Sequence, residues 1–428
     1  MSSTGSRPGD PLEGGHLLVI GVLRDIVARA SELVPSLTTS VLCTADEAKA
    51  LPRLADHFRV VVLPGDASLA DWSGAAAYIH ALRPVDRVLC YGEDGQEPAA
   101  AVCEALSLSG HARETVLAVN SKRLMRDRLA AAGVDDTLAV RVTSPGELAS
   151  FAARVGYPVI CKPTGGVGSQ GVVRIDSADD LAEGLARALA PAPDGTPADV
   201  MAEKFHRGQE FSVEAVSEDG QHLPLCVTQK FVIPGGFVEL GHQLPAPLPP
   251  GAEQQIFRTV AAALDALGVR NGATHTEVIV DGQQVRVIET HLRQGGDRIP
   301  YLLRAARDVD MVEALARQSA GLSAMGQLRA EIEQPLGEAP FAAIWYAVPD
   351  RPGRIAEVRG ESEARAVAGV RDVVLRRTAG DTLTAVTCSD DRPAYCWAVG
   401  ATPELALDAA RSGISKLSFV MEELDESL

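Results

Sequence analysis

Short apolar runs alternate with amphipathic stretches in the first quarter of the chain. Strands are predicted at residues 16–22, 40–43, 59–63 and 87–91, with helical periodicity between them at residues 24–33, 69–82 and 97–106. This order is typical of a parallel sheet covered by helices, in which the loops after the strands carry ligand contacts. Glu93 lies in such a loop. It is a candidate contact for a substrate amine, with a solvated surface carboxylate as the alternative.

A glycine-rich loop interrupts the pattern in the next part of the chain. A capped basic helix is predicted from Asn120 to Leu129, and a second helix at residues 145–155. A strand at residues 157–163 then ends in a lysine and runs into a loop with Gly165, Gly166, Gly168, Ser169, Gln170 and Gly171. Backbone N–H groups of such a loop can close over a polyphosphate. The GK[ST] ending of a Walker loop is missing, and a flexible hairpin is the alternative.

The chain then continues with two strands, at residues 200–205 and 211–216, joined through a turn that contains Glu210. An apolar strand edge suits adenine, and a carboxylate such as Glu210 can accept both ribose hydroxyls. Residues 228–250 are predicted to be long and irregular, and such segments inside a domain are often functional. Glu239 and His242 in this segment are candidate substrate contacts, although a lone loop histidine is often incidental. A helix is predicted at residues 252–267.

Two strand-like runs around the turn Asp281-Gly282 predict a β-hairpin. Its antiparallel pairing would place Glu277 opposite Glu289. Two facing carboxylates repel each other, but a Mg²⁺ ion bound through oxygen removes the objection. Side chains alternate along a strand, so Glu289, His291 and Arg293 would share one face if the strand continues. The pattern predicts a Mg²⁺–nucleotide site with Arg293 directed at a phosphate or carboxylate.

The last part of the chain predicts a small α+β lobe. Asp297 is interpreted as the N-cap of a helix at residues 298–307, and another helix is expected at residues 312–322. From residue 341 the pattern changes to short strands and a final helix. The strands are predicted at residues 342–348, 355–359, 370–376, 383–388 and 396–400, and the helix at residues 403–422.

Composition narrows the class of protein. The 428 residues are 46% hydrophobic and 23% charged, as in an ordinary globular protein. A net charge of −17 argues against nucleic acid or an anionic membrane as the main partner. The seven cysteines form no CxxC pair, which favours reduced thiols and a cytoplasmic location. Residues 1–15 lack a signal-peptide core and are expected to form a disordered tail, and no run is long enough to span a membrane.

The ordered set of motifs resembles the ATP-grasp superfamily over about residues 10 to 340. Its parts are the lysine followed by the glycine-rich loop, the segment from Glu203 to Glu210, and the hairpin with Glu277, Glu289 and Arg293. The whole chain is similar to the L-amino acid ligases, which are bacterial dipeptide synthetases, through residues 237–242 and 295–297. The resemblance implies an α/β and α+β ATP-grasp fold with three domains. They are an N-terminal parallel α/β domain (16–118), an ATP-grasp domain (119–340, divided into a small lobe at 119–199 and a hinge with a large lobe at 200–340) and a C-terminal α+β subdomain (341–428).

The resemblance also implies roles for single residues. The residues implied to bind ATP are Lys122, Lys162, Gly165, Gly166, Gly168, Ser169, Gln170, Gly171, Glu203, Lys204, Phe205 and Glu210. Those implied to hold metal are Glu277, Glu289 and His291. Those implied to bind substrate are Glu93, Glu239, His242, Arg293, Gly295, Gly296 and Asp297, with Arg293, His242 and Glu239 as catalytic residues. ATP and Mg²⁺ are the implied cofactors, with two metal ions and with Mn²⁺ as an alternative ion.

Two positions depart from, or add to, the family pattern. The family has Asn where this chain has His291, and imidazole is a poorer Mg²⁺ ligand than an amide oxygen. His291 is therefore either a weaker metal ligand or a residue facing phosphate or substrate. Asp297 lies where such ligases set the size of the amino-acid pocket. An acid there would favour a cationic or polar substrate, in competition with its interpretation as an N-cap.

The implied activity is ATP-dependent ligation of two amino acids, or of an amino acid and an amine, through an acyl phosphate, with natural-product biosynthesis as the setting. The expected partners are these small molecules, and a homodimer is left open. One alternative is an ATP-grasp ligase with another acceptor, such as a carrier protein or a non-amino-acid acid. The other is a non-catalytic nucleotide-binding protein, although both glutamates and Arg293 are retained.

Overall fold

The computed structural model describes residues 11–22, 24–51, 54–166, 168–190, 198–335 and 337–422. Of the expected N-terminal tail, residues 1–10 lie outside the described residues. The remainder of that prediction is wrong, because Leu12 is buried and its N–H donates to the carbonyl of Ala320 at 2.8 Å. The chain is therefore anchored four residues before its first strand.

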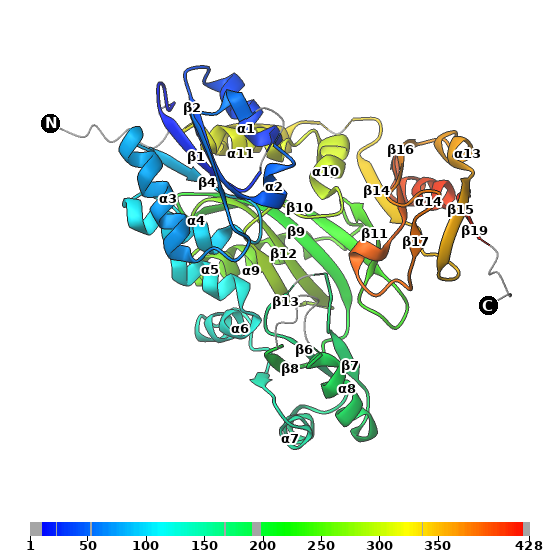
Figure 1. The fold of residues 1–428 in the computed structure, drawn as a ribbon. Helices are drawn as coiled ribbons and strands as arrows, with labels where there is room; N and C mark the ends of the chain where they lie inside the picture. Colours follow the sequence, from blue (N-terminus) through cyan, green and yellow to red (C-terminus); the bar gives the residue numbers. More distant parts are fainter. Residues whose placement is uncertain are drawn as a thin grey trace, which may run out of the picture.

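The N-terminal region is a four-stranded parallel sheet in the order β3-β2-β1-β4, which confirms the predicted α/β unit (Figure 1). Its strands are β1 (His16–Ile20), β2 (Thr38–Thr44), β3 (Arg59–Leu63) and β4 (Arg87–Leu89). Its helices are α1 (Arg24–Leu33), α2 (Ala45–Ala48), α3 (Leu69–Leu82) and α4 (Gln96–Leu106). The alternation of strands and helices in the sequence predicts this topology, because α1, α3 and α4 cover apolar strand faces.

A small lobe follows, with an antiparallel sheet in the order β5-β8-β6-β7. Its strands are β5 (Ala139–Arg141), β6 (Val159–Pro163), β7 (Val173–Ile175) and β8 (Val200–Lys204), and the helices of this part of the chain are α5 (Arg113–Asn120), α6 (Lys122–Ala131), α7 (Pro145–Val155) and α8 (Leu181–Ala188). The predicted lobe boundary at residue 199 is wrong by one strand. β8 pairs with β5 and β6 and so belongs to the small lobe.

Within the described residues, the large sheet has eight strands in the order β13-β12-β9-β10-β11-β14-β18-β16, and its neighbouring strands pair antiparallel. The strands are β9 (Gln209–Glu218), β10 (Gln221–Val232), β11 (Glu239–Leu244), β12 (Gly272–Asp281), β13 (Gln284–His291), β14 (Phe341–Tyr346), β16 (Val370–Leu375) and β18 (Ala394–Gly400). The irregular segment predicted at residues 228–250 is wrong for residues 228–232 and 239–244, whereas residues 233–238 and 245–250 are irregular. Its ends pair as β10 and β11, because tertiary neighbours supply the backbone hydrogen bonds that the local sequence does not signal.

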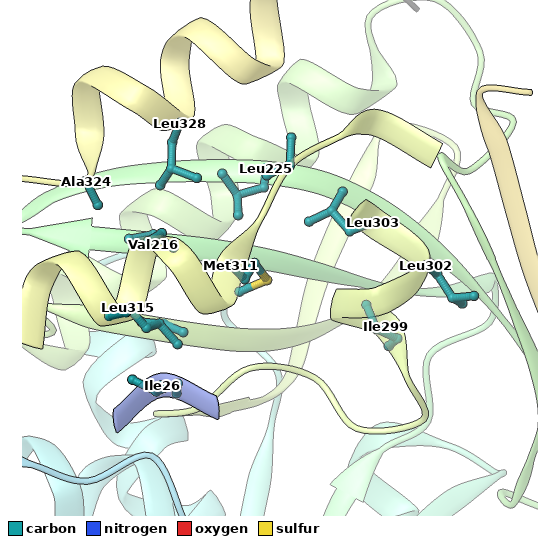
Figure 2. Close-up of a cluster of buried hydrophobic side chains, with 14 of the residues drawn as sticks. Ile26, Val216, Leu225, Ile299, Leu302, Leu303, Met311, Leu315, Ala324 and Leu328 are labelled. Atoms are coloured by element: carbon teal, nitrogen blue, oxygen red, sulfur yellow. The ribbon is translucent and has the colours of Figure 1, made fainter. Parts of the chain in front are cut away.

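Helices pack on the large sheet and join it to the N-terminal region. The helices concerned are α9 (Ala252–Leu267), α10 (Ile299–Arg307), α11 (Met311–Ser319) and α12 (Met325–Glu333). Figure 2 shows side chains of α10, α11 and α12 meeting Val216 and Leu225 of the sheet, with Ile26 of α1 alongside. One apolar core therefore holds the N-terminal region and the large sheet together.

The C-terminal residues extend the large sheet through β14, β18 and β16 and carry a second small sheet, so they are continuous with the large lobe (Figure 1). The other elements are β15 (Gly353–Arg359), α13 (Glu361–Arg365), β17 (Thr382–Leu383), α14 (Pro403–Ile414) and β19 (Ser418–Met421). The helix predicted to reach residue 422 is wrong beyond Ile414, because residues 418–421 pair with β15. The strand predicted at 383–388 is reduced to β17. None of the helices in the described ranges is both long and apolar enough to cross a membrane.

Candidate functional site

A cleft lies between the small lobe and the large sheet. It contains about 1070 Å³ of empty space, open mouth included. Twelve of the predicted site residues line it: Lys122, Lys162, Gly165, Gly166, Ser169, Gln170, Glu203, Lys204, Phe205, Glu210, Glu277 and Glu289. Glu93 and His291 line a second cavity, which shares Lys122, Gly166 and Glu289 with the cleft. Glu239, His242, Arg293, Gly295, Gly296 and Asp297 lie outside both linings, as do Gly168 and Gly171.

The inner end of the cleft has an apolar wall. It is lined by apolar side chains from both lobes: Ile160, Val172, Phe205, Ile279 and Val287. Such a slot between two sheets accepts a flat aromatic ring, and Glu203 and Lys204 at the end of β8 line it together with Phe205. This part of the cleft has the properties of an adenine site.

Glu203 belongs to a buried ion-pair cluster. Arg126 donates to both of its oxygens, at 2.7 and 3.2 Å, and the Lys162 ammonium lies 2.7 Å from Oε2. Burial alone would raise the pKa of Glu203, but the charges of Arg126 and Lys162 outweigh it and lower the pKa to about 2. The Glu203 side chain is therefore held inside the protein, and only its backbone remains for the predicted contact with the base.

Sequence reasoning missed Arg126. Besides Glu203, its guanidinium donates to the carbonyls of Val287 and Ile288 in β13, which ties helix α6 to the hairpin. The available signal was its spacing of four residues from Lys122, which puts both cations on one face of the helix.

The glycine-rich loop lines the cleft and contacts residues on both sides of it. The Lys122 ammonium donates to the Gly166 carbonyl at 3.0 Å, and Ser169 donates to the Phe237 carbonyl of the large lobe at 3.1 Å. Gly171 has a φ of +70°, and a Cβ there would lie 2.9 Å from Pro163 Cγ, so this position requires glycine. Val167 lies outside the described residues. The loop thus bridges the two lobes where a polyphosphate would enter.

The predicted pairing of Glu277 with Glu289 is confirmed by the register of β12 and β13. Their repulsion is offset by two lysines: Lys230 lies 2.6 Å from Glu277 and Lys122 lies 2.8 Å from Glu289. Burial raises the pKa of each glutamate, but Lys230 lowers that of Glu277 and Lys122 that of Glu289, so both pKa values lie below the ordinary range. Two ionised carboxylates therefore face the cleft, and each is paired with a lysine that another cation could replace.

This donor set fits nucleotide-bound Mg²⁺. The ion takes oxygen ligands and usually combines one or two carboxylates with phosphate oxygens and water. In the part of the chain that the structure describes, no three acidic, histidine or cysteine side chains are grouped to hold an ion by themselves. The two glutamates therefore suit a metal that arrives with a polyphosphate rather than a metal held by the protein alone.

The structure gives His291 two carboxylate partners, and its role as a metal ligand stays a prediction. Its Nδ1 lies 2.8 Å from Glu93 and its Nε2 lies 3.2 Å from Glu289. Burial lowers the pKa of His291, but hydrogen bonds to both glutamates outweigh it and raise the pKa above its usual value. An imidazole that donates from both nitrogens has no lone pair for a metal.

Glu93 joins the N-terminal region to the hairpin. Its second oxygen accepts from Arg293 Nε at 2.8 Å. Strand β13 ends at His291, yet Arg293 stays on the same side and reaches the same carboxylate. The predicted substrate contacts Glu93 and Arg293 are thus brought together and are each other's partner.

Lys230 was also missed by sequence reasoning. Its buried ammonium, in a side chain only 4% exposed, lies 2.6 Å from Glu277 and 3.3 Å from Glu239. Lys230 therefore links the metal-type glutamate to the predicted substrate contact. The signal was the only Lys, Arg, Asp or Glu in a strand run, at a position where an unpaired buried charge would be costly.

The interpretation of Asp297 as an N-cap is wrong. Helix α10 starts at Ile299 after Arg298, and Asp297 makes no cap bond to it. Its carboxylate instead lies 2.8 Å from His242 Nε2 and accepts two bonds from Arg392, at 2.8 and 2.7 Å. Because the acid is already paired with Arg392, it does not present a free charge to a cationic substrate. Arg392 was not identified from the sequence, since it lies 95 residues away.

Gly295 is required by a close approach. A Cβ there would lie 2.6 Å from Glu214 Oε1, and its N–H donates to Glu214 Oε2 at 2.7 Å. Glu214 in turn accepts from His275 at 2.5 Å, and burial of His275 is outweighed by this glutamate, which raises the histidine pKa to about 9. The Gly295-Gly296 segment is thus held by a buried charged pair that no local motif signals.

Two family models match the chain. Residues 155–300 match the ATP-grasp domain and residues 345–422 match the L-amino acid ligase C-terminal domain 2. ATP-grasp domains use ATP together with Mg²⁺, which agrees with the donor set of the cleft.

Relatives and solved structures agree with these domains. The chain is 28% identical to alanine–anticapsin ligase of Bacillus subtilis over 238 residues, which cover 51% of this chain and 50% of that protein. An uncharacterised protein of Sinorhizobium fredii is 28% identical over 280 residues, which cover 64% of this chain and 55% of that protein. The chain thus spans about half the length of the curated relatives it matches.

The fold is that of ATP-grasp ligases. An L-amino acid ligase from Bacillus licheniformis superposes with a TM-score of 0.77 at 21% identity, over 96% of this chain and 99% of that one. A phosphoribosylglycinamide synthetase from Anaerococcus prevotii gives 0.67 at 15% identity, over 95% and 100%.

Proposed function

We propose that this chain, which contains an ATP-grasp domain and the C-terminal domain of L-amino acid ligases, is an ATP-dependent carboxylate–amine ligase that joins two amino acids, or an amino acid and an amine. The observation that carries the proposal is the facing pair Glu277 and Glu289, each bonded to a lysine and both lining the cleft.

Nucleotide binding is assigned to the cleft. Phe205 and the backbone of Glu203 and Lys204 would contact the adenine, and Glu210 the ribose. Lys122, Lys162 and the loop from Gly165 to Gly171 would contact the phosphates. Glu277 and Glu289 would hold one or two Mg²⁺ ions, or Mn²⁺, which supply positive charge opposite the transferring phosphoryl group.

The reaction follows from these positions. A carboxylate oxygen of the first substrate attacks the γ-phosphorus, the bond to the bridging oxygen breaks, and ADP leaves. An amine then attacks the acyl carbon, the carbon–oxygen bond to phosphate breaks, and phosphate leaves with the electron pair. Lys122, Lys162 and Arg293 would offset the developing negative charge, and the closed glycine-rich loop would exclude water from the acyl phosphate.

Lys230 contacts Glu277 on one side and Glu239 on the other, and we assign the binding of the amine acceptor to the side of Glu239. Glu239 and His242 are the two groups there that can take the proton released by the amine. Alanine–anticapsin ligase, by its name, joins an amino acid to another compound, and this likeness supports an amino acid as at least one substrate and a natural-product setting. A carrier-bound acceptor or a non-amino-acid acid is the alternative, and a cytoplasmic location stays a prediction that rests on the seven free cysteines.

The test is ADP release from Mg²⁺–ATP across a panel of single and paired amino acids, with mass detection of the product. We expect a defined pair to stimulate ADP release and to yield a dipeptide. Stimulation by a single acid without any condensed product would favour another acceptor. Binding of ATP without stimulation by any member of the panel would contradict amino-acid ligation.

A further inference from the structure

A short turn of the C-terminal region reaches the acceptor side of the proposed site. Residues 389–391 form a single 3-10 turn, and Arg392 follows it. Arg392 is only 1% exposed in its side chain, yet it carries a full positive charge. Its guanidinium lies over the ring of Tyr346, with 3.7 Å from the central carbon to the ring centroid. A buried guanidinium is stable only when its donors are all directed at acceptors.

Arg392 directs those donors at two loops of the large lobe. Nε donates to the Ser389 carbonyl at 2.7 Å and fixes the turn itself. Nη1 donates to the Glu239 carbonyl at 3.0 Å. Nη1 also donates to Oδ2 of Asp297, and Nη2 donates to Oδ1. The fork shape of the guanidinium sets the plane of the Asp297 carboxylate.

Asp297 transmits that orientation to His242. The charges of His242 and Arg392 outweigh burial and hold the pKa of Asp297 below its usual range, so the carboxylate only accepts. His242 Nε2 therefore donates the hydrogen of the 2.8 Å bond to Asp297, and Nδ1 is the second nitrogen of the ring. Among the described residues Nδ1 is buried and has no hydrogen-bond partner.

The backbone at Asp297 is held against its own preference. Asp297 and Arg298 have φ angles of 48° and 65°, a left-handed conformation that side chains other than glycine adopt at a cost. The C-terminal region secures both residues, since Arg392 binds Asp297 and the Tyr395 hydroxyl lies 2.8 Å from Arg298 Nε. Such strain persists only where surrounding contacts determine the position, as at functional sites.

The same turn orients Glu239 directly. Ser389 donates from Oγ to Glu239 Oε2 at 2.8 Å, while Lys230 lies 3.3 Å from Oε1. One four-residue stretch therefore contacts both proton-accepting candidates on the acceptor side, one directly and one through Asp297.

We propose that residues 389–392 are a positioning element for the amine half of the reaction. Ser389 and Arg392 act as positioning residues that hold Glu239 and, through Asp297, His242 in one orientation and one ring tautomer. The C-terminal domain thereby completes the acceptor site, whereas ATP and the first carboxylate are bound without it. This inference rests on the proposed ligase function and assigns a task to a domain outside the ATP-grasp cleft.

The test separates the two halves of the reaction. Hydroxylamine traps an acyl phosphate as a hydroxamate and needs no acceptor pocket, so its rate reports on carboxylate activation alone. Complete ligation with the preferred acceptor amine gives KM and kcat for the second half. For Arg392→Lys and Asp297→Asn we expect acceptor kcat/KM to fall at least about tenfold more than the hydroxamate rate, because a misplaced general base loses about this much or more. Ser389→Ala should also lower the acceptor kcat/KM more than the hydroxamate rate, but by a smaller factor.

A matched control comes from the same turn. Arg376 donates to the Ser389 carbonyl at 3.2 Å and to Asp390 at 3.1 Å, but among the described residues it does not hydrogen-bond to Glu239 or Asp297. Arg376→Met should not show the bias against the acceptor half. Equal ratios for Arg376→Met and Arg392→Lys would mean that the turn matters only for folding, and would overturn the positioning role.

A spectroscopic readout is independent of activity. Arg392→Met would leave Asp297 as an unpaired buried charge and can unfold the region. The milder variants Arg392→Lys and Asp297→Asn are therefore used in this test too. Nitrogen NMR of ¹⁵N-histidine-labelled protein, assigned with His242→Gln, should show the Nε2–H tautomer for His242 in the wild type and a changed tautomer ratio in both variants. An unchanged His242 signal would overturn the inference. Wild-type protein that binds ATP yet forms no hydroxamate with any amino acid would instead contradict the proposed function, and with it the acceptor role of the turn.

Discussion

Glu203 and Glu289 are each bonded to a lysine, at 2.7 and 2.8 Å, and both line the same cleft, yet Glu203 is buried and Glu289 only half-buried. The Glu203 side chain is 6% exposed and is shared by Lys162 and the two-pronged Arg126. The Glu289 side chain is 18% exposed, and it borders two cavities.

This difference in exposure and pairing distinguishes a glutamate that stabilises the fold from one that can bind a ligand. Removing one member of a closed buried pair leaves an uncompensated charge, which is costly, so Glu203 is suited to hold the lobes in place. A polyphosphate and its cation can replace the bond between Lys122 and Glu289. Phosphate oxygens can accept from the lysine, while the metal binds the glutamate. Glu203 is thus a structural carboxylate and Glu289 a ligand-exchanging one.

The largest effect is expected at Glu203. Glu203→Ala leaves Arg126 and Lys162 without their counter-charge inside the protein, and should lower the free energy of unfolding by about 3–5 kcal/mol. Urea denaturation with linear extrapolation measures this. A loss below about 1 kcal/mol, the range of exposed pairs, would contradict the structural role.

The next effect concerns catalysis at Glu289. Glu289→Gln keeps the size of the side chain but removes the charge that would hold the metal, so the ADP-forming rate should fall by about 10²–10³-fold. The thermal unfolding midpoint should change far less than in Glu203→Ala, because the substitution also removes the repulsion between Glu289 and Glu277. A stimulated rate that survives this substitution would refute the metal assignment.

A smaller effect is expected where the N-terminal region meets the hairpin. Glu93→Gln weakens two charge-assisted bonds, to His291 and Arg293, and should cost about 1–3 kcal/mol of unfolding free energy. Burial raises the pKa of Glu93, but His291 and Arg293 outweigh it and lower the pKa from 4.5 to about 2.

The sign of the pH dependence follows from that shift. The folded pKa lies below the unfolded one, so the contribution of Glu93 is present above pH 4.5 and is lost as the pH falls through 2. The stability difference between wild type and Glu93→Gln should therefore be constant at neutral pH and shrink on acidification. Urea denaturation at several pH values tests this, and a difference that grows towards low pH would contradict the pairing.

The smallest effect is expected for an exposed pair of the same small lobe. Arg141 and Asp199 lie within 2.5 Å but are 61% and 46% exposed, so solvent screens them. Asp199→Asn should change the free energy of unfolding far less than Glu203→Ala does. This variant is the matched control for Glu203→Ala, and a comparable loss in both would remove the contrast on which the interpretation of Glu203 depends.

Local patterns in the sequence predicted much of this molecule. The parallel N-terminal sheet, the glycine-rich loop and the pairing of Glu277 with Glu289 follow from alternation, glycine spacing and a two-residue turn, all of which act over a few residues. The errors share a different cause. Strand β11, the strand β19 and the side chain of Asp297 are determined by partners distant in the chain, such as β14, β15 and Arg392.

The sequence by itself determined which residues can carry charge, coordinate oxygen-seeking ions or bend the backbone, because these are properties of the side chains and of local turns. Only the tertiary structure decided how the charges are shared: Glu203 with Arg126 and Lys162, Glu289 with Lys122 and His291, Asp297 with His242 and Arg392. The physical reason is that a buried charge is governed by its nearest neighbours in space, and folding brings those neighbours from segments that no local pattern connects.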